Sequence, residues 1–105
     1  NWYNNSNGSW CCIDWKTGKA HYETKWITKG AIIAAEGKLY CLEEKSCNVA
    51  LVNPDPKKFD KVSSFKTSGG TGPAWAHPSI YNKLLLIRRG DVLMAYDLSV
   101  EGFTR

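Results

Sequence analysis

The chain has 105 residues, a length typical of a single domain, and a net charge of +4. Its Lys and Arg residues are scattered along the sequence, whereas nucleic-acid-binding proteins cluster them on one face, so we expect no nucleic-acid partner. No run approaches the roughly 18 apolar residues of a membrane-spanning helix, so we expect no membrane span.

Short runs typical of β-strands follow one another along the chain, and no window has a helical period. Turn residues rich in Gly, Asn, Asp and Pro separate these runs. Short strands joined by tight turns indicate antiparallel meanders, so we predict an all-β chain. The predicted strands are Ser9–Asp14, His21–Trp26, Ala31–Ala35, Lys38–Glu43, Cys47–Val52, Lys61–Thr67, Ala76–Tyr81, Lys83–Arg88 and Val92–Asp97.

The sequence repeats itself at an offset of 45 residues (83 − 38), because Lys38-Leu39-Tyr40 lines up with Lys83-Leu84-Leu85. A partial third copy lies upstream, where residues 9–14 match residues 92–97. A period in the forties built from short strands is the signature of a β-propeller blade. Closed propellers have roughly 4–8 blades, and this chain holds only about two.

We therefore predict a partial β-propeller of about two blades, each a four-stranded antiparallel meander, and we expect the chain to be a fragment of a larger propeller. The predicted segments are a partial blade at residues 1–29, a full blade at residues 30–68 and a partial blade at residues 69–105.

Four cysteines leave the pairing of thiols open. Cys41 and Cys47 flank a predicted hairpin turn, and they would lie opposite each other if Glu44 were its tip. Directly opposite positions bring Cβ atoms to about 4.5–5.5 Å, which allows a disulfide. The favoured interpretation is instead two small buried thiols. Cys11 and Cys12 are adjacent in a strand, where their side chains point to opposite faces, so we do not expect them to bond each other.

The run from Cys12 to Tyr22 resembles the tryptophan-docking motif of the PQQ-like, or quinoprotein-type, propeller repeats. That motif reads Ala-x-Asp-x-x-Thr-Gly-x-x-x-Trp; Asp14, Thr17 and Gly18 match it, while Cys12 replaces the Ala and Tyr22 the Trp. The resemblance implies that the small residue lets blades approach, that Asp and Thr-Gly form a tight turn, and that the aromatic ring packs on the adjacent blade.

The later copies keep parts of this motif. The middle copy retains Ala50 in the position of the small residue, and the last copy retains Ala95 and Asp97. The resemblance thus covers nearly the whole chain and is strongest for the bacterial PQQ-like repeat proteins of uncharacterised function.

Family resemblance implies two functions. Some relatives bind no cofactor and act as scaffolds, and we expect this chain to be a non-catalytic scaffold or protein-binding module, periplasmic or secreted. Its partners would be other propeller blades, from the missing part of the chain or from further copies, and a protein. The alternative is part of a dehydrogenase that oxidises an alcohol or sugar with pyrroloquinoline quinone (PQQ) and calcium.

The sequence offers few candidates for chemistry. His77 sits at the start of a predicted innermost strand, the strand that lines a propeller channel, so Trp75 and His77 are candidates for a ligand-facing pair that binds a cofactor. A loop-capping role for His77 is the favoured interpretation. No spacing of His and Cys indicates a metal site, and Glu43-Glu44 is interpreted as a solvated turn.

The aromatic residues are expected to hold blades together. Each buried aromatic side chain removes about 150–250 Å² from water, which is worth several kcal/mol before the entropic cost. We predict this role for Trp15, Trp26, Trp75 and Tyr96.

Overall fold

The computed structural model describes residues 2–4 and 9–98. Within these ranges every regular element is a β-strand, and all pairings are antiparallel. The strands are β1 (Trp2–Asn4), β2 (Ser9–Ile13), β3 (Ala20–Lys25), β4 (Gly30–Ala35), β5 (Lys38–Glu43), β6 (Asn48–Asn53), β7 (Asp60–Lys66), β8 (Ser79–Tyr81), β9 (Leu84–Arg89) and β10 (Val92–Asp97).

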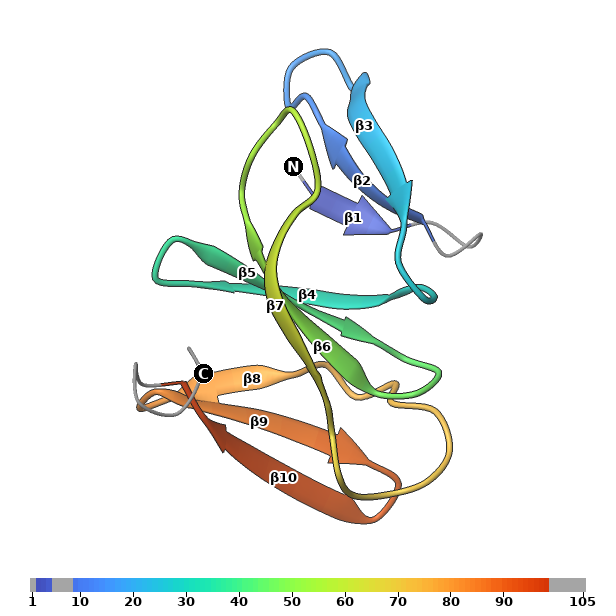
Figure 1. Ribbon diagram of the computed structural model, residues 1–105, viewed down its shortest axis with the longest axis vertical. Coiled ribbons are helices and arrows are strands. Elements are labelled where there is room, and N and C mark those ends of the chain that lie inside the picture. The colour runs from blue at the N-terminus through green and yellow to red at the C-terminus, as the bar shows by residue number, and fades with distance from the viewer. Residues whose placement is uncertain (1, 5–8, 99–105) are drawn as a thin grey trace.

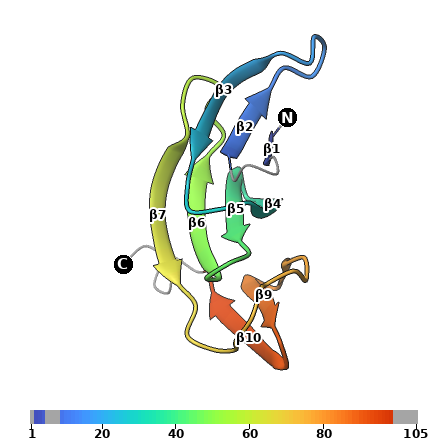
Figure 2. The same cartoon turned by 90° about the vertical axis from the view of Figure 1, so that its right-hand side faces the viewer.

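Three meander sheets result: a first sheet of β1-β2-β3, a middle sheet of β4-β5-β6-β7 and a last sheet of β8-β9-β10. The predicted all-β class and the four-stranded antiparallel meander are confirmed. The sheets follow one another along the longest dimension of the molecule, 39 Å, with the middle sheet between the other two (Figures 1 and 2). They fall within residues 1–29, 30–68 and 69–105, whose assignment as blades stays a prediction.

Strand bounds follow the sequence closely except at the start of the last sheet. Lys38–Glu43 and Val92–Asp97 have the predicted bounds. The strand predicted from Ala76 begins instead at Ser79. Pro78 lacks an N–H for the ladder, so the chain enters regular pairing only after it.

The middle sheet is buried on both faces. One face packs around Trp10 of the first sheet through Leu39, Cys41, Ala50 and Val52. The other face, which includes Tyr40 and Leu42, packs against the last sheet. The buried contacts from the strands of the last sheet are Leu85, Ile87 and Met94. Side chains alternate along β5 between these two cores, as expected of a strand covered on both sides.

The register between sheets shows how the repeat is built. The first hairpins of the middle and last sheets close with the pairs Ala35–Lys38 and Tyr81–Leu84, so they are related by 46 residues (84 − 38). Cys41, which pairs with Ala50, therefore corresponds to Ile87, which pairs with Met94. The following strands, β6 and β10, are thus related by 44 residues (94 − 50).

The ungapped offset of 45 is therefore the mean of two offsets. The turn between β5 and β6 is two residues longer than the turn between β9 and β10, which lowers the offset from 46 to 44. A shift of one residue moves a strand side chain to the opposite face. The predicted correspondence of Ala50 with Ala95 is wrong for this reason: Ala50 is buried against the first sheet, whereas Ala95 is exposed.

All three sheets stack in the same sense. Cys41 faces the first sheet, and its counterpart Ile87 faces the middle sheet. The β-bulges at Cys12/Ile13 and Leu51/Val52 relate β2 to β6 by 39 residues (51 − 12), so Trp10 corresponds to Val49. Trp10 faces the middle sheet and Val49 faces the last sheet. Corresponding faces therefore meet at the two junctions, and the middle sheet turns one face toward the first sheet and the opposite face toward the last.

Candidate functional site

The junction of the first and middle sheets is centred on Trp10. Its side chain is fully buried, and its indole N–H is shared between the backbone oxygens of Trp26 and Thr28, at 3.0 and 3.1 Å. The rings of Trp10 and Trp26 meet edge to face at 6.0 Å, and Trp26 also contacts Phe59. The predicted packing role of Trp26 is confirmed, but the sequence analysis missed Trp10, the larger contributor.

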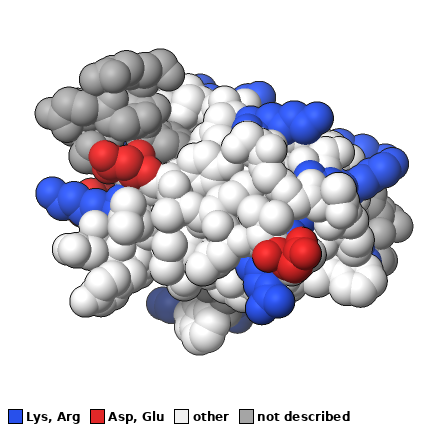
Figure 3. Space-filling view, turned by 90° about the horizontal axis from the view of Figure 1, so that it is seen from below, with Lys and Arg blue, Asp and Glu red and all other residues white. Residues whose placement is uncertain are grey.

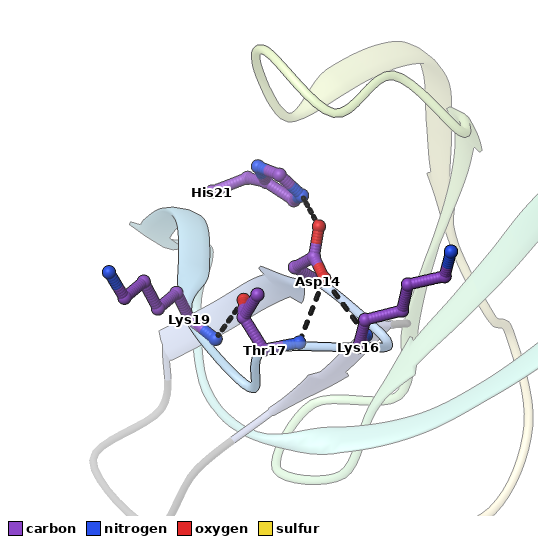
Figure 4. A network of polar contacts seen from close by, with 5 residues as sticks. All are labelled: Asp14, Lys16, Thr17, Lys19 and His21. Atoms are coloured by element: carbon purple, nitrogen blue, oxygen red, sulfur yellow. Dashed lines mark hydrogen bonds and ion pairs between the residues drawn. The ribbon is translucent and has the colours of Figure 1, made fainter.

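The residues that match the docking motif build one turn (Figure 4). Oδ1 of Asp14 accepts hydrogen bonds from the backbone N–H groups of Lys16 and Thr17, at 2.8 and 3.0 Å. The Thr17 hydroxyl accepts one from the N–H of Lys19 at 3.2 Å. Gly18 has φ +75°, a conformation that glycine adopts without steric cost.

The same turn stabilises the charge on Asp14. The hydrogen bonds from Thr17 and Lys16 lower the pKa of its carboxyl group, and His21, whose Nε2 lies 3.5 Å from Oδ2, lowers it further. Because the group is exposed, the arrangement fixes the shape of the turn and contributes little to overall stability.

Tyr22 and Cys12 lie on the face of the first sheet that is turned toward the middle sheet. They pair across β2 and β3, and Cys12 is two residues from Trp10 in the same strand. Burial raises the pKa of Tyr22, and Cys12 of its own sheet and Cys41 of the middle sheet raise it further. The docking role of Tyr22 and Cys12 stays a prediction, as does that of Asp97.

The predicted opposition of Cys41 and Cys47 is wrong. Cys41 pairs with Ala50, and Cys47 lies in the turn at φ 59°. Both are free thiols, and they point into different cores on the two sides of the middle sheet, so no disulfide joins them. The interpretation as two small buried thiols is confirmed. Cys11 and Cys12 are free and buried as well.

Glu43 also departs from expectation, because it is fully buried rather than solvated. Its carboxylate accepts hydrogen bonds from the backbone N–H groups of Lys45, Ser46 and Asn48, at 2.9–3.1 Å, and from the side-chain amide of Asn48 at 2.9 Å. The carboxylate thus accepts hydrogen bonds from N–H groups of the turn that would otherwise need water as their partner. Of the two glutamates only Glu44 is partly exposed, and its Oε1 atom lies 3.9 Å from the ammonium group of Lys29.

Arg89 holds the same turn from the last sheet. Its guanidinium donates to the carbonyl oxygen of Gly72 at 2.7 Å and approaches those of Lys45 and Ser46 at 3.4 Å. Connections from two sheets are therefore locked together at one end of the stack.

His77 is not part of the strand that the sequence predicts from Ala76, and the role of Trp75 and His77 as a ligand-facing pair stays a prediction. Both lie in the connection before β8, and both side chains are exposed. Nδ1 of His77 lies 2.9 Å from the carbonyl oxygen of Pro78, which is the loop-capping geometry. Within residues 2–4 and 9–98, no three His, Cys, Asp or Glu residues are grouped as metal ligands.

Of the other three aromatic residues predicted to hold sheets together, one does so and two do not. Tyr96 packs on Phe65 of the middle sheet, with ring centroids 4.8 Å apart, and its hydroxyl accepts from the N–H of Ser68. That prediction is confirmed. Trp15 and Trp75 were wrongly expected to be buried between sheets, since they are 80% and 76% exposed. Both lie in connections outside the strands.

No described residue outside the last sheet covers the face of that sheet opposite the middle sheet, which we name the open face. Its side chains point away from the middle sheet and include the exposed Tyr81, Leu84 and Leu93. Figure 3 views the molecule from this side and shows a broad uncharged surface with scattered charged groups. Exposed apolar patches on a protein surface are often sites of association, which makes the open face a candidate for one.

No protein-family model matches the chain, and no curated protein is similar to it at a significant level. The described residues also contain no helix that is long and apolar enough to cross a membrane. The resemblance to PQQ-like repeats therefore remains an expectation from the motif residues.

Proposed function

We propose that the chain is a non-catalytic scaffold of the β-propeller type, with sheets that serve as blades. The observation that carries the proposal is the same-sense stacking of three meander sheets, in which corresponding faces recur toward the preceding sheet. Propellers repeat a four-stranded sheet in this manner. Stacked repeats need a neighbour on each apolar face, because a single unit cannot bury its faces alone.

The open face is the surface through which this scaffold associates. It corresponds in the repeat to the face of the middle sheet that carries Tyr40 and Leu42 and is covered by the last sheet. A further sheet of the same repeat is therefore the partner that fits it, and a second copy of this chain supplies one. The charged positions Arg88 and Asp97 lie at opposite ends of the face and leave its centre apolar.

Sedimentation velocity over a range of protein concentrations tests this association. We expect the chain to sediment increasingly as a dimer or larger species as its concentration rises. Leu93 is 69% exposed at the open face, so Leu93→Lys places a charge in the contact and should keep the chain monomeric.

Val62→Lys is the matched control, since Val62 is also exposed, at 52%, but belongs to β7 of the middle sheet. It should associate like the original chain. A chain that stays monomeric at the highest concentration, or a Leu93→Lys variant that associates unchanged, would contradict the assigned surface.

The alternative, a PQQ- and calcium-dependent dehydrogenase, makes a separate prediction. Such an enzyme needs oxygen ligands for calcium and a polar contact to the quinone. Native mass spectrometry with added PQQ and calcium distinguishes the two functions: we expect the mass of the protein alone. A stoichiometric quinone adduct would replace the scaffold with the enzyme. A periplasmic or secreted location stays part of the proposal and rests on the family resemblance.

A further inference from the structure

The open face carries a charged residue of opposite sign at each end. Ile87 faces the middle sheet, so its neighbour Arg88 lies on the open face. Tyr96 packs on the middle sheet, so its neighbour Asp97 also lies on the open face. Leu93, the partner of Arg88 in the ladder, is four residues from Asp97 (97 − 93), so the two charges are separated by about 13 Å along the strands.

The guanidinium group of Arg88 is placed to meet a carboxylate from outside the chain. The residue is exposed, and its Nε donates to the carbonyl oxygen of Gly90 at 3.0 Å. This hydrogen bond holds the side chain at the end of the sheet and uses neither of its terminal nitrogens. A guanidinium group binds a carboxylate through charge-assisted hydrogen bonds, which are stronger than neutral ones.

The outer face of the first sheet does not suit the open face as a partner. Trp10 faces the middle sheet, so its neighbours Ser9 and Cys11 lie on the outer face of β2. Their exposed fractions are only 3% and 1%. A second copy therefore cannot reach this face at its central strand, and stacking does not continue there as it does within the chain. Among the described sheet faces, the apolar surface that a second copy presents is its own open face.

We propose that two copies of the chain associate open face to open face, about a two-fold axis that runs across the strands. This inference rests on the association surface assigned in the proposed function. A two-fold contact uses the same patch on both copies. An axis across the strands reverses their direction, so the Arg88 end of each copy lies over the Asp97 end of the other.

The charges distinguish this axis from the alternative. An axis parallel to the strands would place the two Arg88 side chains over each other, because β9 is the middle strand of the sheet. Like charges that face each other across an interface disfavour association. With the axis across the strands, each Arg88 instead meets Asp97 of the partner copy, and the same contact forms twice.

Two consequences follow for the size and strength of the assembly. An isologous contact occupies the open face of both chains, so assembly stops at the dimer. The face measures about 13 Å along its three strands and about 10 Å across them. This is small beside the roughly 800 Å² that each partner buries in a standard interface, so the dimer is weak and forms at high protein concentration.

Mixing two charge-reversal variants tests the arrangement. Arg88→Glu and Asp97→Lys each put like charges at both contacts, so each variant alone should dimerise at least about tenfold more weakly than the original chain. A mixed dimer of the two variants has opposite charges at both contacts and should form about as readily as the original dimer. Native mass spectrometry of the equimolar mixture, at low ionic strength, identifies the mixed dimer by its mass.

Two further variants serve as controls. The double variant Arg88→Glu/Asp97→Lys carries both reversals in one chain and should dimerise by itself. Lys66→Glu reverses the charge of an exposed residue of β7, outside the open face, and should leave dimerisation unchanged. Rescue by mixing separates charge pairing from loss of structure, because a variant that does not fold cannot regain the contact.

The outcomes distinguish this inference from the proposed function. Association that Leu93→Lys abolishes, but that neither the mixture nor the double variant restores, would overturn the two-fold arrangement and leave the open face as the association surface. Species larger than a dimer would overturn it in the same way. An original chain that stays monomeric at every concentration would contradict both the arrangement and the surface.

Discussion

Glu43 is the residue whose environment departs furthest from what its chemistry favours. A carboxylate is rarely fully buried unless its charge is compensated, and here four N–H donors surround it within 3.1 Å. The donors belong to the turn that follows β5, so the side chain organises the backbone on which β6 begins. Its role is structural and local.

Replacing Glu43 by Gln should destabilise the fold by about 1–3 kcal/mol, because the amide N–H₂ group meets N–H donors where an oxygen accepted them. Urea denaturation measures the change. Glu44→Gln is the control: its ion pair with Lys29 is long and partly exposed, and its loss should cost less than about 0.5 kcal/mol. Equal midpoints for the Glu43→Gln variant and the original chain would refute the role of the buried carboxylate.

Sequence alone could not place this residue. Glu43-Glu44 is followed by Lys45 and Ser46, a composition typical of a solvated turn. The turn also contains Cys47 in a left-handed conformation, at φ 59°, which a cysteine in the sequence does not indicate. Asp14-x-x-Thr17-Gly18 was predictable, because short polar side chains and glycine specify their turn locally.

At the scale of elements, β2 and β5 are joined by a single large side chain. Trp10 fills the space above Cys41 and Ala50, and its indole N–H supplies the donor for two carbonyl oxygens of the chain between β3 and β4. Packing and hydrogen bonding thus depend on the same residue.

Trp10→Phe should lower the free energy of unfolding by about 2–4 kcal/mol, since it leaves a cavity and removes the donor to Trp26 and Thr28. Denaturant titration followed by far-ultraviolet circular dichroism measures this loss. Trp75→Phe makes the same chemical change at a side chain that is 76% exposed, and it should alter stability by no more than about 0.5 kcal/mol. Similar losses in the two variants would show that Trp10 does not join the sheets.

The strands themselves were predictable, but the face of each strand in the last sheet was not. Alternation and turn residues determine where β5 and β10 lie, and both were predicted with their observed bounds. Whether Met94 or Ala95 corresponds to Ala50 depends on the lengths of two turns, which an ungapped comparison averages. The residue types do not reveal the wrong correspondence, because positions 50 and 95 are both alanine.

At the scale of the whole molecule, stacking places thiols where water does not reach them. Cys41 is 0% exposed at the junction of the first and middle sheets, and burial raises its pKa from 9.0 to about 12. The thiol is neutral in both the folded and unfolded states below pH 9. Between pH 9 and 12 the unfolded chain loses the proton while the folded chain keeps it, so stability falls as pH rises.

Raising the pH from 8 to 10 should therefore lower the free energy of unfolding by about 1 kcal/mol through Cys41. Guanidinium titrations at the two pH values, under reducing conditions, measure the loss. Cys41→Ala is less stable at both pH values because it leaves a small cavity, but its pH dependence should be weaker by that amount. An identical pH dependence in the two proteins would mean that the thiol is accessible to solvent.

The two-residue difference between the turns after β5 and β9 also bears on how such repeats diverge. Adding two residues to a hairpin turn leaves the inward and outward sides of the next strand unchanged, whereas adding one exchanges them and turns polar positions into the core. The length of this turn can therefore change by two residues between copies of the unit, but a change of one residue is disfavoured. An alignment of the units that does not allow a two-residue gap in this turn will misalign the strands that follow it, even where their architecture is the same.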